Sequence, residues 1–146
     1  MKRLALIALS AATPIVATLF PGAASAETFN VNGPGNFTSP SGNISCAIEP
    51  GSVRCDIKER DWSPPARPSS CNENVGFGQG ITLSTGQEAE FVCAGDTTFG
   101  VGKPLAYGDT IVSGVIECTS EESGIQCWDT QYGGEFTLAR EGYDLD

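Results

Sequence analysis

The side chains best suited to acid–base chemistry in this sequence are carboxylates, because the chain contains no histidine. Its absence excludes Ser-His-Asp and Cys-His catalysis, together with the usual histidine-containing zinc sites. Glu88 and Glu90 fall on one face of a predicted strand, with Cα atoms about 7 Å apart. A glycosidase pair can have such a spacing, but two glutamates on a solvated face are commonplace. A carboxylate-dependent hydrolase is therefore only an alternative hypothesis.

The remaining patterns do not indicate a metal or nucleotide site. Glu117, Glu121, Glu122 and Asp129 surround two cysteines and would at most hold calcium weakly, because no Asp-x-Asp-x-Asp-Gly loop is present. The cysteine spacings lack the close pairs of a zinc site built from four cysteines. The glycine-rich stretches GFGQG and FGVGKP lack the Gly-Lys-Ser/Thr ending of a phosphate-binding loop. We expect no metal and no cofactor.

Two aromatic residues are the best candidates for contacts with a ligand. Trp62 precedes Ser63-Pro64-Pro65 in a proline-rich stretch that predicts an extended surface segment, and Tyr107 stands in the turn-like sequence YGD. Both side chains combine an apolar body with a polar tip, which suits a sugar or a peptide. For Trp62 the competing interpretation is packing against the core. We predict that Trp62 and Tyr107 are the binding residues.

The elements that would position these side chains are indicated by a repeated phrase. SGNISCAIEPGSVRC, residues 41–55, aligns without gaps with SGVIECTSEESGIQC, residues 113–127, at an offset of 72. Each copy has the form Cys-x8-Cys, which predicts a cross-strand disulfide within a hairpin. The pairs are then Cys46–Cys55 and Cys118–Cys127, which leaves Cys71–Cys93. The alternative is that one copy bonds to the other and pins two sheets together.

The first copy shows the alternation of a half-buried antiparallel hairpin. With Cys46 opposite Cys55, Ile48 faces Val53 and Ile44 faces Ile57 on one side, while the other side is mostly polar. The reversal falls at Pro50-Gly51. Because an L-Pro-Gly pair is not a favoured two-residue hairpin turn, we expect a somewhat wider loop.

Short strand patterns continue along the chain and no convincing helical period is present outside the N-terminus. GITLS and QEAEFVC flank the turn Thr85-Gly86, and EFTLAR gives a late strand signal. Such short strands with glycine-bearing turns are typical of all-β folds. We predict a small, disulfide-stapled antiparallel sandwich or open barrel with two related Cys-x8-Cys hairpins.

Residues 1–26 have the features of an export signal. Lys2 and Arg3 precede an apolar run from Leu4 to Phe20, and Ala24-Ser25-Ala26 suits a signal peptidase, so we expect cleavage before Glu27. Residues 27–146 form a single predicted domain of 146 − 26 = 120 residues. This domain carries (8 − 2) − 18 = −12 charges, which disfavours nucleic acid and anionic membranes as partners. Six cysteines after a signal peptide are typical of an oxidising, extracellular compartment.

Several motifs in fixed order resemble an uncharacterised family of small secreted actinobacterial proteins, of the type found in mycobacteria. The motifs are SPSGNISC (39–46), VRCDI (53–57), CAGDT (93–97), LAYGD (105–109) and EFTLAREGY (135–143). The resemblance spans about residues 37–143 and implies secretion, three disulfides and one small β-rich domain. It implies no established activity or cofactor. Relatives are expected to carry a histidine near Gly133-Gly134, which this chain lacks.

These observations favour a secreted, non-enzymatic binding or interaction module. Its partner would be an extracellular protein, peptide or glycan, and the protein would be released or associated with the cell wall. An acidic inhibitor of a basic secreted enzyme is a variant of this hypothesis. The alternatives are a structural envelope protein without a discrete site and, less favoured, the carboxylate-dependent hydrolase.

Overall fold

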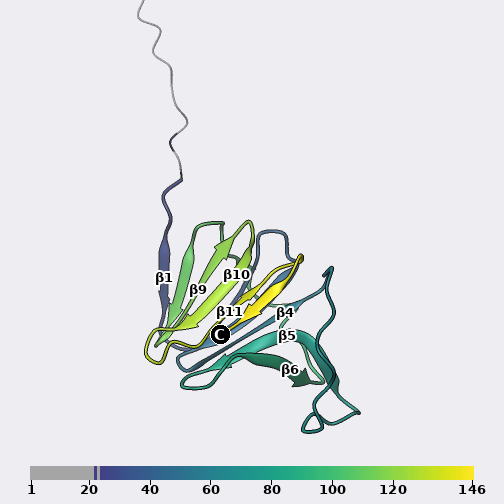
Figure 1. Cartoon of the computed structure of the whole chain (residues 1–146). Coiled ribbons are helices and arrows are strands. Elements are labelled where there is room, and N and C mark those ends of the chain that lie inside the picture. The colour runs from purple at the N-terminus through teal and green to yellow at the C-terminus, as the bar shows by residue number, and fades with distance from the viewer. Residues whose placement is uncertain (1–21, 23) are drawn as a thin grey trace, which may run out of the picture.

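The computed structural model describes residues 22 and 24–146, and these residues fold into two six-stranded β-sheets that pack face to face (Figure 1). Most of the predicted signal sequence lies outside the described residues. Sheet A has, in spatial order, β1 (Thr28–Val31), β8 (Thr110–Ser113), β9 (Ile116–Glu121), β10 (Gly124–Asp129), β11 (Glu135–Leu138) and β12 (Tyr143–Leu145). Sheet B has β6 (Glu90–Ala94), β5 (Gly76–Ser84), β4 (Ser52–Ile57), β3 (Ile44–Glu49), β2 (Gly35–Thr38) and β7 (Lys103–Pro104).

The all-β prediction is confirmed, and the described residues contain no helix. In particular, none of residues 22 and 24–146 belongs to a helix able to cross a membrane. Most strand pairs are antiparallel as predicted, but each sheet also holds one parallel pair, β1 with β8 and β2 with β7. These two parallel pairs were not predicted from the sequence.

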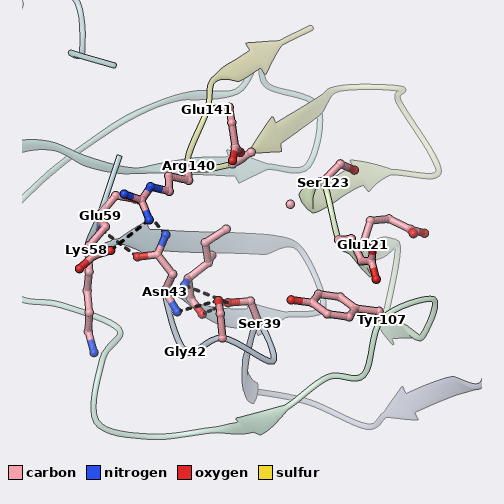
Figure 2. Close-up of a pocket in the computed structure, with 15 residues that line it drawn as sticks. Ser39, Gly42, Asn43, Lys58, Glu59, Tyr107, Glu121, Ser123, Arg140 and Glu141 are labelled. Atoms are coloured by element: carbon pink, nitrogen blue, oxygen red, sulfur yellow. Dashed lines mark hydrogen bonds and ion pairs between the residues drawn. The ribbon is translucent and has the colours of Figure 1, made fainter. Parts of the chain in front are cut away.

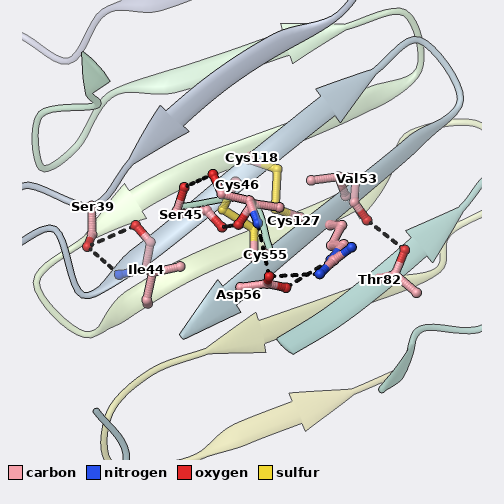
Figure 3. The surroundings of a disulfide bond; sticks show 12 residues. Ser39, Ile44, Ser45, Cys46, Val53, Cys55, Asp56, Thr82, Cys118 and Cys127 are labelled. Atoms are coloured by element: carbon pink, nitrogen blue, oxygen red, sulfur yellow. Dashed lines mark hydrogen bonds and ion pairs between the residues drawn. A yellow bond between two sulfur atoms is a disulfide. The ribbon is translucent and has the colours of Figure 1, made fainter. Parts of the chain in front are cut away.

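Both Cys-x8-Cys hairpins form in the predicted register. Cys46 pairs with Cys55 across β3 and β4, and Cys118 pairs with Cys127 across β9 and β10, each with Cα atoms 4.1 Å apart. The third disulfide joins Cys71 to Cys93. All three predicted disulfides are therefore confirmed. The two hairpin disulfides are fully buried and belong to one hydrophobic core between the sheets (Figure 3).

The Pro50-Gly51 reversal is tighter than predicted, since Glu49 pairs directly with Ser52. Its two carbonyl groups are bonded from outside the hairpin. Val115 N donates to Pro50 O at 3.3 Å, and Thr85 N donates to Gly51 O at 2.8 Å. These two hydrogen bonds stabilise a tight turn that the conformational preferences of Pro-Gly alone do not favour.

The sequence repeat corresponds to a structural repeat. β2 to β5 form one antiparallel series of neighbours and β8 to β11 form the other. Even hydrogen bonds outside the ladders recur at the offset of 72, since Lys58 N donates to Asn43 O at 3.0 Å and Thr130 N donates to Val115 O at 2.9 Å. The described residues thus contain two four-stranded units of the same strand order, and the central hairpins of these units are the part that is repeated in sequence.

The two units exchange edge strands. β1 comes before the first unit in the chain but pairs with β8 of the second, whereas β7 comes before the second unit but pairs with β2 of the first. Each sheet therefore contains a strand that is joined in the chain to the other unit. The two units are therefore held together by the hydrogen bonds of these exchanged strands as well as by their shared core.

The connection between β6 and β7 runs across the outer face of sheet B, from one edge strand to the other. It is anchored there by polar side chains. Arg54 forms ion pairs with Asp56 at 2.9 Å and Asp96 at 2.7 Å, and Thr98 Oγ1 donates to Ser45 O at 2.6 Å. Asp56 is almost completely buried. The motifs VRCDI and CAGDT therefore meet in one structural network.

Candidate functional site

The two-fold repeat gives the sandwich two related ends, and one of them is closed. There the Pro50-Gly51 turn of the first hairpin packs against Ser113-Gly114, where β8 ends and the turn into β9 begins. Gly114 has a positive φ of 59°, and a Cβ at this position would collide with the backbone of Pro50. No room is left for a ligand between these two segments.

The related end is open. At the repeat positions of Pro50-Gly51 stand Glu122-Ser123, and at those of Ser113-Gly114 stand Ser41-Gly42. Gly42 also has a positive φ, of 70°, but a Cβ here would have nothing within 4 Å. A cavity of about 450 Å³ separates the two segments. We call it the groove (Figure 2), and it is lined by Ser39, Ser41–Ile44, Lys58, Glu59, Tyr107, Glu121–Gly124 and Ala139–Glu141.

The SPSGN segment forms a fixed wall of the groove. Ser39 Oγ accepts a hydrogen bond from Ile44 N at 3.1 Å and shares one with Ser41 Oγ, also at 3.1 Å. The Asn43 side chain both donates to Glu59 O at 2.9 Å and accepts from Glu59 N at 2.8 Å. The segment is therefore held in shape from both sides without any ligand.

Tyr107 supplies an aromatic surface in the groove. The side chain is 47% exposed, and Figure 2 shows its hydroxyl group directed toward Ser39. Its loop is fixed by Gly108 N, which donates to Ser120 O at 2.7 Å, and by Asp109 N, which donates to Ala106 O at 3.0 Å. The predicted binding residue Tyr107 thus lies where a ligand can reach it.

Trp62 lies outside the residues that line the groove and supports one of its walls. The indole Nε1 donates to Ala139 O at 2.8 Å, and the ring packs edge-on against Tyr143 with centroids 4.7 Å apart. The ring also packs against the core. Ala139 begins the groove wall that continues to Glu141. The structure therefore does not bring Trp62 and Tyr107 together, and direct ligand contact by Trp62 stays a prediction.

The charged side chains around the groove differ in whether they already have a partner within the protein. Arg140 pairs with Glu59 at 3.5 Å and with Asp61 at 3.6 Å. Lys58 Nζ lies 4.5 Å from the centre of the Phe99 ring, and Figure 2 shows its side chain pointing away from Tyr107. Three exposed glutamates, by contrast, have no ion pair among the described residues; they are Glu121, Glu122 and Glu141. The groove consequently offers negative hydrogen-bond acceptors.

Comparison with known families gives a match over nearly the whole sequence. Residues 12–145 match the profile of a family of unknown function, DUF6636. The chain belongs to the DUF6636 family. No curated protein and no solved structure matches it. The expected membership of an uncharacterised family is confirmed, whereas the actinobacterial origin stays a prediction.

The other carboxylates singled out in this DUF6636 sequence lie apart from the groove or have protein partners. Glu88 precedes β6, whereas Glu90 is its first residue, so the two do not form the predicted pair along one strand. Asp129 is buried and accepts hydrogen bonds from Gln131 N, Tyr132 N and Gly86 N at 2.8, 3.2 and 3.0 Å. Across residues 22 and 24–146, no group of three metal-binding side chains is present.

Sequence reasoning missed most residues that line the groove of this DUF6636 domain, although a signal for them existed. At the turn of the repeated phrase, Pro50-Gly51 in the first copy is replaced by Glu122-Ser123 in the second, whereas Glu49 matches Glu121. A proline in one copy and a glutamate at the same position in the other mark the ends that become closed and open. Segments 58–59 and 139–141 join the site only through the packing of the sheets.

Proposed function

We propose that this protein is a secreted, non-enzymatic binding module that holds a cationic group of an extracellular protein or peptide in the groove. The observation that carries the proposal is the difference between the two related ends of the sandwich. One is sealed by Pro50, and the other leaves a cavity of about 450 Å³ beside three glutamates that have no ion pair within the described part of the chain. A closed copy of the same unit shows that the fold does not require this cavity.

The chemistry of the lining favours a lysine or arginine side chain as the bound group. Carboxylates accept hydrogen bonds and do not donate them, whereas ammonium and guanidinium groups only donate. The two cations nearest the groove are engaged, Arg140 by Glu59 and Asp61 and Lys58 by Phe99. Tyr107 adds an aromatic face on which a cation can rest, a contact worth about 0.5–1 kcal/mol at an exposed site.

Two further features support binding in an extracellular setting. The three disulfides fit an oxidising compartment. The buried carboxylates of Asp56 and Asp129 already bond to Arg54 and to backbone N–H groups. These carboxylates are thus occupied by the protein itself, which favours a binding role over acid–base catalysis. The excess of acidic residues would also steer a basic partner toward the domain.

The proposal is tested by calorimetric titration of the oxidised domain with an acetylated, amidated hexalysine peptide. The test variant is Glu121→Gln/Glu122→Gln/Glu141→Gln. The matched control is Glu73→Gln/Glu88→Gln/Glu90→Gln, which removes the same charge from exposed sites outside the groove. We expect the groove variant to bind about tenfold more weakly than the wild type, because each exposed pair contributes roughly 0.2–1 kcal/mol.

The control variant should lose much less affinity than the groove variant. An equal loss in both would show that only net charge matters, and would contradict a binding site in the groove. No binding by the wild-type protein would instead favour the structural alternative.

A further inference from the structure

The start of the predicted mature chain is held at both of its backbone groups. Glu27 N donates to Asp109 Oδ1 at 2.8 Å, and Glu27 O accepts from Thr110 N, also at 2.8 Å. The parallel pairing of β1 with β8 begins at the next residue, with Thr28 opposite Thr110. Glu27 is therefore the first residue tied to the domain, because none of the described residues before it takes part in a hydrogen bond.

The predicted signal-peptidase site coincides with this anchor. Cleavage after Ala24-Ser25-Ala26 adds water across the amide bond between Ala26 and Glu27. The C–N bond breaks, Ala26 leaves as a carboxylate, and the nitrogen of Glu27 takes up the proton to become an α-ammonium group. The atom that gains the positive charge is the one already 2.8 Å from Asp109.

We propose that Asp109 forms a binding site for the α-ammonium group that signal-peptide cleavage creates at Glu27. Before cleavage the contact is a hydrogen bond from a neutral amide. Afterwards the donor is a cation, so the attraction between an ammonium and a carboxylate is added to the hydrogen bond. The Asp109 carboxylate has no other hydrogen-bond or ion-pair partner among the described residues, so it is available for this role.

The contact between Glu27 and Asp109 lies where it can hold β1 against sheet A. β1 is a four-residue edge strand whose one partner among the described strands is β8, and most of its residues are exposed. Such chain ends fray unless they are tied down. Asp109 also follows Tyr107 by two residues in the loop that lines the groove. Removal of the signal would thus secure an exchanged strand and, through the same loop, the aromatic wall of the groove.

The test compares oxidised domains that begin at Glu27 or, one residue earlier, at Ala26. The longer form keeps the amide hydrogen bond but moves the ammonium group away from Asp109. We expect the Glu27 form to have a Tm about 2–4 °C higher, the scale of one partly exposed ion pair in a domain of this size. In Asp109→Asn this difference should vanish, whereas Glu73→Gln, an exposed carboxylate remote from β1, should retain it.

Equal Tm values for the two wild-type forms, or a difference that persists in Asp109→Asn, would overturn the proposal. Intact-mass measurement of the exported protein supplies the second test. A mass corresponding to residues 27–146 with three disulfides supports it. A different first residue, or a mass lower by one water from cyclisation of Glu27, would overturn it because the ammonium group would be absent. Neither measurement involves a groove ligand, so both are independent of the proposed function.

Discussion

Asp129 is a buried carboxylate that is stabilised by hydrogen bonds from backbone N–H groups. Its burial disfavours the ionised form, but the N–H groups of Gln131, Gly86 and Tyr132 outweigh this cost and lower the pKa of Asp129. Gly86 belongs to the turn between β5 and β6 of sheet B, whereas Asp129 ends β10 of sheet A. The charge of one side chain therefore joins the two sheets.

This lowered pKa gives the domain a defined response to acid. The ionised carboxylate stabilises the folded state fully above the ordinary Asp value of about 3.8, and this contribution is lost as the pH falls through the lower pKa of the folded state. The pKa of Asp96 is lowered by its hydrogen bond to Arg54 and by the positive charge of Arg54. The ionised Asp96 therefore also stabilises the folded state, and this contribution is likewise lost in acid. We expect Asp129→Asn to lower the urea midpoint at neutral pH and to differ less from the wild type below about pH 3.

Urea unfolding at a series of pH values checks this expectation. A gap between the two proteins that stays constant down to about pH 2 would contradict the assigned role of the Asp129 charge.

At the scale of elements, the two related glycines Gly42 and Gly114 report on the two ends of the sandwich. Both have a positive φ, so alanine strains the backbone at either position by roughly 1–2 kcal/mol. Only at Gly114 would the added Cβ also collide with Pro50. We expect Gly42→Ala to lower the free energy of unfolding by about 1–2 kcal/mol and Gly114→Ala by about 3 kcal/mol or more.

Each glycine variant is the control for the other, because the backbone conformation is shared and the surroundings differ. Equal losses of stability in urea unfolding would contradict the contrast between a sealed and an open end.

Comparison of the elements shows which parts of the fold can be predicted from the sequence and which cannot. The strand registers of the β3–β4 and β9–β10 hairpins were predicted correctly, although not the tight Pro50-Gly51 turn, because alternation and a Cys-x8-Cys repeat act over short distances. The pairs β1–β8 and β2–β7 were not, since β7 has only two residues and one is a proline. Tyr107 was predicted as a binding residue from its type alone. The groove around it depends on sheet packing that brings residues 39–43, 121–124 and 139–141 together.

At the scale of the whole molecule, the described residues form two four-stranded units of the same strand order, held together by exchanged edge strands and by a shared core with two buried disulfides. Because both units have the same strand order, the differences between them show which features the fold itself does not require. The sealed end joins the halves. The open end is free of that task and carries the exposed glutamates beside Tyr107.

The most direct test of this account is an NMR titration of the ¹⁵N-labelled, oxidised domain with the hexalysine peptide. The account predicts saturable amide shift changes at Gly42, Tyr107 and Ser123 in the groove. The related positions Gly51 and Gly114, at the sealed end, should stay unchanged and so serve as an internal control. Comparable shifts at both ends, or shifts confined to other acidic surfaces, would contradict the claim that the open end is the binding site.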